Sequence, residues 1–221
     1  MKVVPSFTPA KAPDISLLNL DKVQLDATNG ARLDALRLAN GGDPAWQMRK
    51  LREAHELLAL GQIAWNRMTV VKLELFRELR AILALNCPIP CRPDGNNRLR
   101  LARGALLGMR YGDEAVRRPQ PGSAFFQIFE PHHVFHASVH QPEQTLCLGA
   151  SLPAGIRVRE LVLLAYAALS MQTVQVNEFA PTGVMNLEAA TWWQQNLERV
   201  PLTREPFLVN ITPTPAEDAL C

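Results

Sequence analysis

Residues 145–173 read TLCLGASLPAGIRVRELVLLAYAALSMQT, a cysteine between two leucines followed by a long apolar segment. From residue 155 onward, apolar side chains occur on almost every side of a helical projection. This pattern predicts a helix buried in the core rather than an amphipathic surface helix. Burial of each large apolar side chain stabilises the fold by about 1.5–3 kcal/mol. We therefore expect this helix to anchor the core.

Two stretches upstream of it also predict helices. Asp43 can cap a helix and Pro44 has a favourable φ for its first turn, and apolar residues then recur at spacings of three, four and seven. This pattern predicts a helix over residues 44–62. Residues 66–85 are predicted to form a second helix, with charged side chains opposite an apolar face. That apolar face consists of Val71, Leu75, Leu79 and Ile82.

The middle of the chain is predicted to form strands. Residues 98–112, RLRLARGALLGMRYG, follow a turn sequence and indicate a strand pair or one bent strand. Residues 124–131, AFFQIFEP, and residues 133–139, HVFHASV, alternate well enough to form two further strands. The fold class expected from these elements is α+β, with an antiparallel meander of about four strands and flanking helices.

The C-terminal part begins with a helix signal and ends with a proline-rich segment. Asn186 is a favourable N-cap, and Glu188 stands in the first turn of the helix that would follow. Residues 201–221 contain four prolines and are expected to be a flexible tail. The predicted organisation is an N-terminal extension with one helix over residues 1–65, a folded domain over residues 66–200, and the tail.

Composition disfavours several classes of function. The 221 residues include 23 Lys and Arg against 21 Asp and Glu, a net charge of +2, whereas nucleic-acid binding requires a concentrated basic face. Prolines interrupt the first 18 residues where a signal peptide would be apolar, and no apolar run reaches the roughly 20 residues that span a bilayer. We expect a cytoplasmic protein with reduced cysteines and without a nucleic-acid or membrane partner.

Cys147 is the candidate nucleophile, although a cysteine flanked by leucines is often a core residue. Four of the five histidines lie in one nine-residue stretch, residues 132–140, upstream of Cys147. On a strand, His132, His136 and His140 would share one face. Three interpretations remain open: a metal site with Cys147, a Cys–His hydrolase, or mainly structural histidines with His140 alone near the thiol. A zinc module is not expected, because the cysteines at positions 87 and 91 have no second pair.

From about Leu79 to Gln195, the order of these features resembles a ubiquitin-conjugating enzyme. In that family a helix leads to a strand meander, a His-Pro-Asn turn, an Ile-Cys-Leu segment, a long buried helix, an Asn/Pro-rich loop and a helix that opens with Asn-x-Glu-Ala-Ala. The strongest local matches are Leu146-Cys147-Leu148 and Asn186-Leu187-Glu188-Ala189-Ala190. The turn, the Cys segment, the loop and the last helix read SVHQPEQ, TLCLG, NEFAPTG and MNLEAATWWQQN.

This resemblance implies a UBC-like fold over residues 66–200 and a transferase activity. Cys147 would carry a ubiquitin-like modifier as a thioester, received from a ubiquitin-activating-like enzyme, and would transfer it to an amine of a target protein. No cofactor or metal is implied, since ATP is used one step earlier. His140 would stabilise the oxyanion that forms during transfer, and Glu178 would orient or deprotonate the amine.

The sequence also departs from the family pattern. His140 or Gln141 stands where an Asn is expected, and Gly149 follows Leu148 where Asp is usual. These departures resemble the divergent bacterial members of the family. Two alternatives follow. A catalytically silent adaptor with this fold is disfavoured by the retained cysteine. A Cys–His hydrolase is disfavoured because every histidine precedes Cys147 and no oxyanion-loop sequence is evident.

Overall fold

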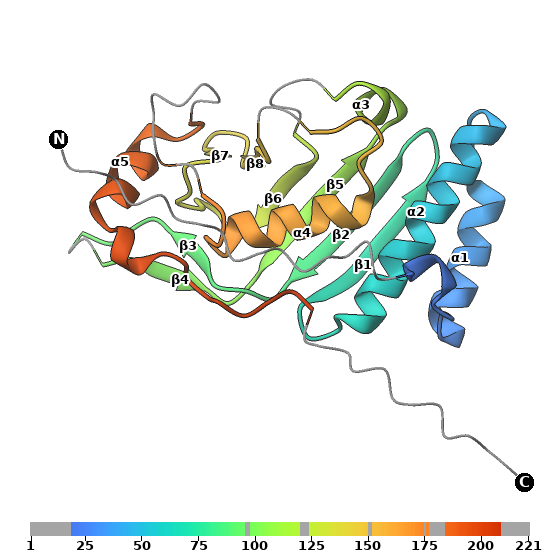
Figure 1. The fold of residues 1–221 in the computed structure, drawn as a ribbon, viewed down its shortest axis with the longest axis horizontal. Coiled ribbons are helices and arrows are strands. Elements are labelled where there is room, and N and C mark those ends of the chain that lie inside the picture. The colour runs from blue at the N-terminus through green and yellow to red at the C-terminus, as the bar shows by residue number, and fades with distance from the viewer. Residues whose placement is uncertain are drawn as a thin grey trace, which may run out of the picture.

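The computed structural model describes residues 19–95, 98–119, 124–149, 152–174, 176 and 184–208. Figure 1 shows an α+β arrangement of a twisted sheet with helices packed against it. The helices are α1 (Ala27–Ala39), α2 (Pro44–Ile63), α3 (Asp113–Arg117), α4 (Val158–Leu169) and α5 (Leu187–Gln195), with short 3-10 turns at Leu20–Lys22 and Leu197–Arg199.

The main sheet has six strands in the order β1-β2-β5-β6-β8-β7, and every neighbouring pair is antiparallel. Its strands are β1 (Met68–Leu75), β2 (Leu79–Leu85), β5 (Ala105–Tyr111), β6 (Phe126–Glu130), β7 (Val139–His140) and β8 (Thr145–Leu146). A separate pair is formed by β3 (Ile89–Cys91) and β4 (Arg100–Ala102). The predicted α+β class and the antiparallel sheet are confirmed, but the sheet has six strands and not about four, and β8 lies between β6 and β7.

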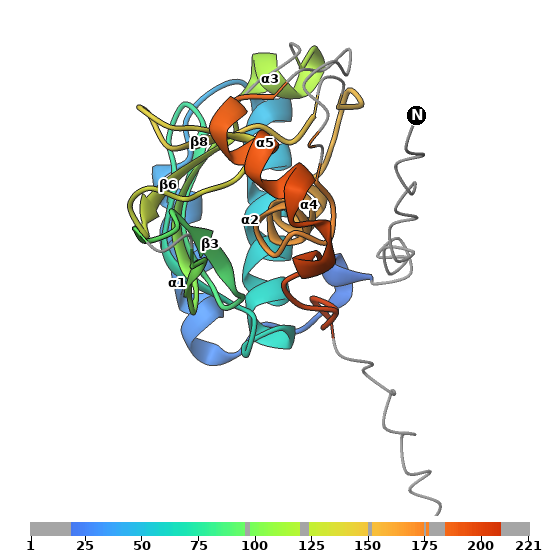
Figure 2. The same ribbon diagram turned by 90° about the vertical axis from the view of Figure 1, so that its left-hand side faces the viewer.

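Helices α2 and α4 lie on the same side of the main sheet (Figure 2). Side chains alternate along β2, so that Leu79, Leu83 and Leu85 point into the core while Arg80 is exposed. The buried face of α4 packs against them through residues such as Leu161. The predicted buried helix over this segment is thus confirmed, and it lies at the centre of the core.

The predicted helix over residues 66–85 is wrong, because this stretch forms the β1–β2 hairpin. Leucine, glutamate and arginine favour helices only weakly, and packing against neighbouring strands overrides that preference. The register shifts between Val70 and Lys72, which interrupts the alternation expected of a strand. Phe76 N donates to Glu78 O across a tight turn without glycine, proline or asparagine, so the usual sequence signal of a hairpin is missing.

Helix α2 confirms the predicted helix over 44–62 almost to the residue, and the Asp43 side chain accepts a hydrogen bond from Trp46 N as a cap. Its residues Leu57 and Leu60 belong to the same apolar core as the strands. The division of the chain at residue 65 stays a prediction, but the packing joins α2 to the sheet. Within the described residues, no helix combines the length and apolar character needed to cross a bilayer.

Helix α1 was not predicted, and it lies beside the edge strand β1. Arg32 Nη1 donates to Val70 O at 3.1 Å, which occupies a carbonyl on that edge. Such cover protects an exposed strand from pairing with other chains.

Candidate functional site

Cys147 directly follows β8, at the end of a short hairpin. Its backbone N donates to Ser138 O at 2.9 Å, which continues the β7–β8 pairing by one residue. Leu146 is buried and Leu148 packs against the core, so by alternation the half-buried side chain of Cys147 points away from the core. The expected position of Cys147, on an extended segment after the last strand, is confirmed.

Local backbone geometry leaves space at the thiol. Cys147 Sγ lies 3.8 Å from Gly149 O. Gly149 has a φ of 124°, a conformation that other residues rarely adopt. Among the described residues, no atom would lie within 4 Å of a Cβ at Gly149, so the backbone conformation favours glycine there. Gly149 thus permits the bend of the chain after the thiol.

The other described cysteines lie in less suitable surroundings. Cys87 is only 3% exposed, and burial raises the pKa of its thiol to about 12. Burial also raises the pKa of the half-buried Cys91 thiol. A thiol must ionise to act as a nucleophile, so neither residue is favoured. Cys221 lies outside the described residues.

The hairpin places Ser138 opposite Cys147, and the sequence analysis did not single out Ser138. Ser138 is the cross-strand neighbour of Cys147, and such pairs have Cβ atoms about 4.5–5.5 Å apart. His140 pairs with Thr145, one step further along the same face, and its Nδ1 lies 3.6 Å from the Glu143 carboxylate. Only the strand register could have identified Ser138.

The predicted strand over residues 133–139 is wrong, and so is the shared face of His132, His136 and His140. His133 has a positive φ of 62°, and Val139 N donates to His136 O across a turn. His136 is fully buried, and its Nδ1 accepts a hydrogen bond from Ser138 N at 3.0 Å. Burial lowers the pKa of His136 to about 4, although an interaction with the Ala168 backbone opposes this shift.

These positions bear on the metal interpretation. His132 is exposed, His136 is buried, and His140 lies on the hairpin. Across the described ranges, no three His, Cys, Asp or Glu residues are placed to hold a metal ion. The described histidines therefore do not share a metal site.

The start of α5 is fixed behind the hairpin. Met185 N and Asn186 N both donate to Ala137 O, at 2.8 and 3.0 Å. The Asn186 side chain accepts from Ala189 N at 3.0 Å, which confirms the predicted cap. Glu178, the predicted group for the attacking amine, lies outside the described residues, so the structure does not place it.

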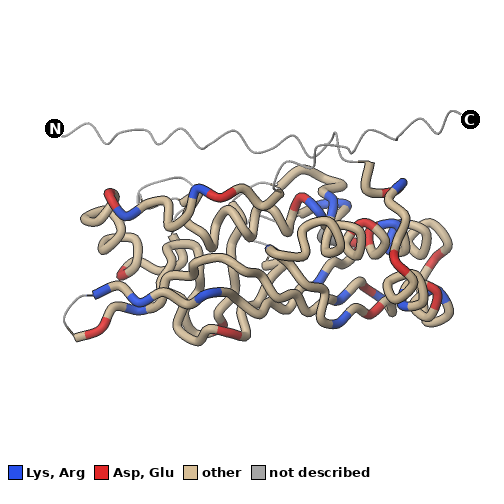
Figure 3. The backbone as a smooth tube through the Cα atoms, turned by 90° about the horizontal axis from the view of Figure 1, so that it is seen from below, with Lys and Arg blue, Asp and Glu red and all other residues tan. Residues whose placement is uncertain are grey.

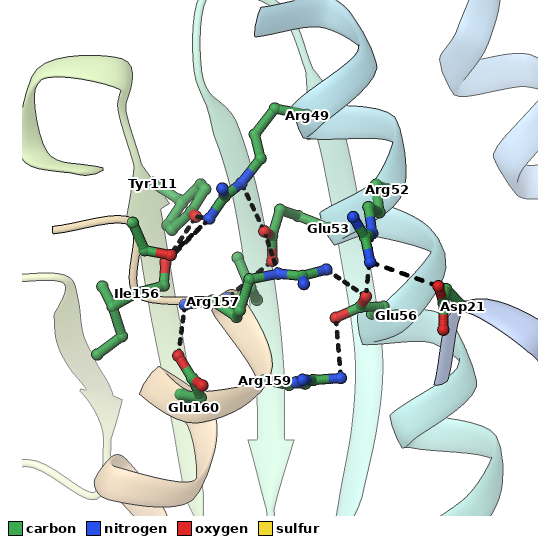
Figure 4. Close-up of polar contacts among 12 residues, drawn as sticks. Asp21, Arg49, Arg52, Glu53, Glu56, Tyr111, Ile156, Arg157, Arg159 and Glu160 are labelled. Carbon is green, nitrogen blue, oxygen red and sulfur yellow. Dashed lines mark hydrogen bonds and ion pairs between the residues drawn. The ribbon is translucent and has the colours of Figure 1, made fainter. Parts of the chain in front are cut away.

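The chain after Cys147 is held at its far end by a buried ionic network (Figure 4). Glu53 and Glu56 of α2 are fully buried. Glu53 Oε2 accepts from Val158 N at 2.9 Å, and Arg157 Nε lies 2.7 Å from the other oxygen of Glu53. Arg157 also bonds Glu56. The first turn of α4 is therefore attached to α2.

The same network holds the loop immediately before α4. Arg49 Nη2 donates to Gly155 O at 2.8 Å, and the Tyr111 hydroxyl donates to Ile156 O at 2.8 Å. These bonds fix the loop to α2 and β5. The network thus supports residues 155–158, at the start of the buried helix.

Charge over the described surface is mixed. Figure 3 shows Lys and Arg positions interspersed with Asp and Glu along the backbone. The site therefore consists of a partly exposed thiol at the end of a hairpin, with Ser138 and His140 on the neighbouring strand and an anchored segment at residues 155–158. Comparisons of the chain with family models, curated proteins and solved structures found no match.

Proposed function

We propose that this chain is a ubiquitin-like-protein conjugating enzyme of the divergent bacterial type, which carries its modifier as a thioester on Cys147. The observation that supports this most is the position of the thiol. Cys147 is half-buried, points away from the core, and stands between the end of an antiparallel sheet and a buried helix.

The order of elements supports the same proposal once one assignment is changed. Helix α2, rather than residues 66–85, takes the place of the family's first helix. Strands β1, β2, β5 and β6 then follow as neighbours, and the β7–β8 hairpin leads to Cys147. After it come the buried helix α4 and the helix α5, which opens with the Asn186 cap.

The proposed reaction has two acyl-transfer steps. The Cys147 thiolate attacks the modifier's C-terminal thioester on the activating enzyme, a new C–S bond forms, and the activating enzyme's thiolate leaves and is protonated. Thiolate is intrinsically nucleophilic, so no strong base is required. An amine of the target protein then attacks the Cys147 thioester and loses a proton to water as the Cys147 thiolate leaves.

The second step creates a tetrahedral oxyanion that needs a hydrogen-bond donor. Ser138 and His140 lie on the same side of the hairpin as Cys147, with Ser138 directly opposite it. We assign donation to these two residues together, in place of the family's Asn. The proposed partners are the modifier, its activating enzyme and a target protein.

Reconstitution tests the proposal. Incubated with its activating enzyme, ATP and modifier, the protein is expected to gain one modifier through a bond that a reducing agent cleaves. Cys147→Ala is expected to abolish this adduct, and Cys147→Lys to convert it into a stable isopeptide. Cys91→Ala and Cys221→Ala serve as matched controls and are expected to change neither result. An adduct that survives Cys147→Ala, or that maps to Cys221, would overturn the assignment.

A Cys–His hydrolase is the alternative that shares the nucleophile. The Cys147 thiol contacts the Gly149 carbonyl, and the fully buried His136 bonds the Ser138 amide, so these contacts form no thiol–imidazole pair. A panel of fluorogenic esters and peptides separates the two activities. Turnover lost in Cys147→Ala, without any modifier adduct in the wild type, would favour the hydrolase.

A further inference from the structure

A hollow lies on the face of the main sheet opposite to α2 and α4. It encloses about 480 Å³ and is lined by side chains of β1, β2, β5 and β6, and by Thr145 of β8. This volume lies within the range typical of small-ligand sites, roughly 300–1,000 Å³. Nothing in the proposed thioester chemistry uses this hollow.

The floor of the hollow is apolar and depends on one glycine. Gly108 pairs with Ile82 across β2 and β5, and both residues line the hollow. A Cβ on Gly108 would lie only 2.4 Å from Cζ of Phe129, so this ring lies directly on the glycine. Phe129 remains 38% exposed. An aromatic ring and an aliphatic side chain are therefore both open to a ligand.

The rim of the hollow has an excess of positive charge. Arg80 and Arg110 both bind the single carboxylate of Glu78, with Arg80 Nε at 2.6 Å and Arg110 Nη2 at 3.3 Å. The third cation on the rim is neutralised separately, because Lys72 Nζ lies 2.7 Å from Glu74. Three cations and one carboxylate therefore line the hollow, and with Glu78, which binds the two arginines from outside the lining, three cations face two carboxylates.

The two guanidinium groups can still bind an anion. Their side chains are 58% and 71% exposed. Each guanidinium has five N–H donors, more than one shared carboxylate can accept. A planar guanidinium suits a carboxylate or a similar oxyanion.

We propose that this hollow binds a small amphipathic monoanion. Its aryl or acyl body would lie on Phe129 and Ile82, and its carboxylate or similar headgroup would face Arg80 and Arg110. The charge of the rim excludes an amphipathic cation, and the apolar floor distinguishes the ligand from a simple inorganic anion. This proposal is independent of the activity proposed for Cys147.

Two matched probes test it: 1-naphthalenesulfonate, and the neutral 1-naphthalenemethanol of similar size. Calorimetric titration of the full chain is expected to show tighter binding of the sulfonate by about tenfold, as charge-assisted hydrogen bonds suggest. Amide NMR shifts are expected on β2 and β5 and at Thr145, and not on α2. Equal affinity for both probes, shifts confined to other elements, or no binding at millimolar concentration would overturn the proposal.

Variants identify the groups involved. Arg110→Gln leaves one guanidinium on Glu78, removes the excess charge, and is expected to eliminate the advantage of the sulfonate. Arg37→Gln on α1 is the matched control and is expected to leave both affinities unchanged. Phe129→Ala removes the aromatic floor and is expected to weaken both probes alike. Retention of the tenfold difference in Arg110→Gln would refute the assigned orientation.

Discussion

The two faces of the main sheet differ in how they use polar side chains. On the face covered by α2 and α4, the carboxylates of Glu53 and Glu56 are fully buried among arginines, and one of these, Arg49, also donates to backbone carbonyls. On the other side, Cys147 and His140 are partly exposed and have few contacts. The groups with the most interactions support the fold, whereas the candidate site consists of groups left accessible. The charged network around Glu53 and Glu56 therefore supports the fold and lies apart from the candidate site.

The largest expected effect is on the covered face. Glu53→Ala removes the acceptor of Val158 N and one of the two buried carboxylates that Arg157 binds. Removing one member of a buried pair costs roughly 3–5 kcal/mol of unfolding free energy. Urea denaturation measures this loss. Glu74→Ala, on the opposite face, is the control and is expected to leave stability nearly unchanged. Similar losses in both variants would contradict the distinction between the faces.

The second effect concerns the β7–β8 hairpin and the rate of thioester discharge, not the free energy of unfolding. Ser138→Ala is expected to slow discharge of the thioester to free lysine by about 10²–10³, the usual effect of removing one oxyanion donor. His140→Ala is expected to slow it less, because His140 stands one step further along the strand. Single-turnover discharge assays measure both rates. Thioester formation should be unaffected, so a parallel loss of charging would point to damage to the hairpin instead.

The third effect is a pH dependence of the free energy of unfolding that comes from the buried His136. Its folded-state pKa of about 4 lies below the ordinary value of 6.5, so the folded state favours the neutral ring. The contribution to stability is therefore complete above pH 6.5 and is lost as the pH falls toward 4. The total loss is up to about 3 kcal/mol.

Denaturation at several pH values measures this dependence. His136→Asn keeps an acceptor for Ser138 N but cannot gain a proton, and its unfolding free energy is expected to fall less between pH 6.5 and 4. His132→Gln replaces an exposed histidine and is the control, expected to follow the wild type. A His136→Asn profile as steep as that of the wild type would show that other groups cause the dependence.

Much of the fold was predictable where local chemistry and packing agree. The helix starts at Asp43-Pro44 and at Asn186 predicted helices α2 and α5, and the apolar segment after residue 155 predicted α4. The β1–β2 hairpin was not predictable from periodicity, because the register shift at Val70 and the tight turn at Phe76 removed both of its usual signals. Tertiary pairing decided this region.

The candidate site was predictable only in part. Cys147 and His140 were predicted from the order of the surrounding segments and from the resemblance that this order carries, and their roles stay predictions. Ser138 was missed because its role depends on pairing across a hairpin whose strands are only two residues each. His136 was misplaced on a strand, since its turn is formed by a bond between its own ring and a nearby amide. Contacts of this kind leave no periodic pattern.

The smallest effect tests the anchor behind the hairpin. Asn186→Ala removes the side-chain bond to Ala189 N, and loss of such a cap costs about 1 kcal/mol. Because Met185 N and Asn186 N still bond Ala137 O through the backbone, the hairpin is expected to keep its position. Discharge of the Cys147 thioester should therefore continue at nearly the wild-type rate, while thermal denaturation shows a small loss. Asn186→Asp retains a capping oxygen and should restore stability. A large loss of discharge in Asn186→Ala, restored by Asn186→Asp, would instead show that α5 positions the nucleophile and that the two faces are coupled through Ala137.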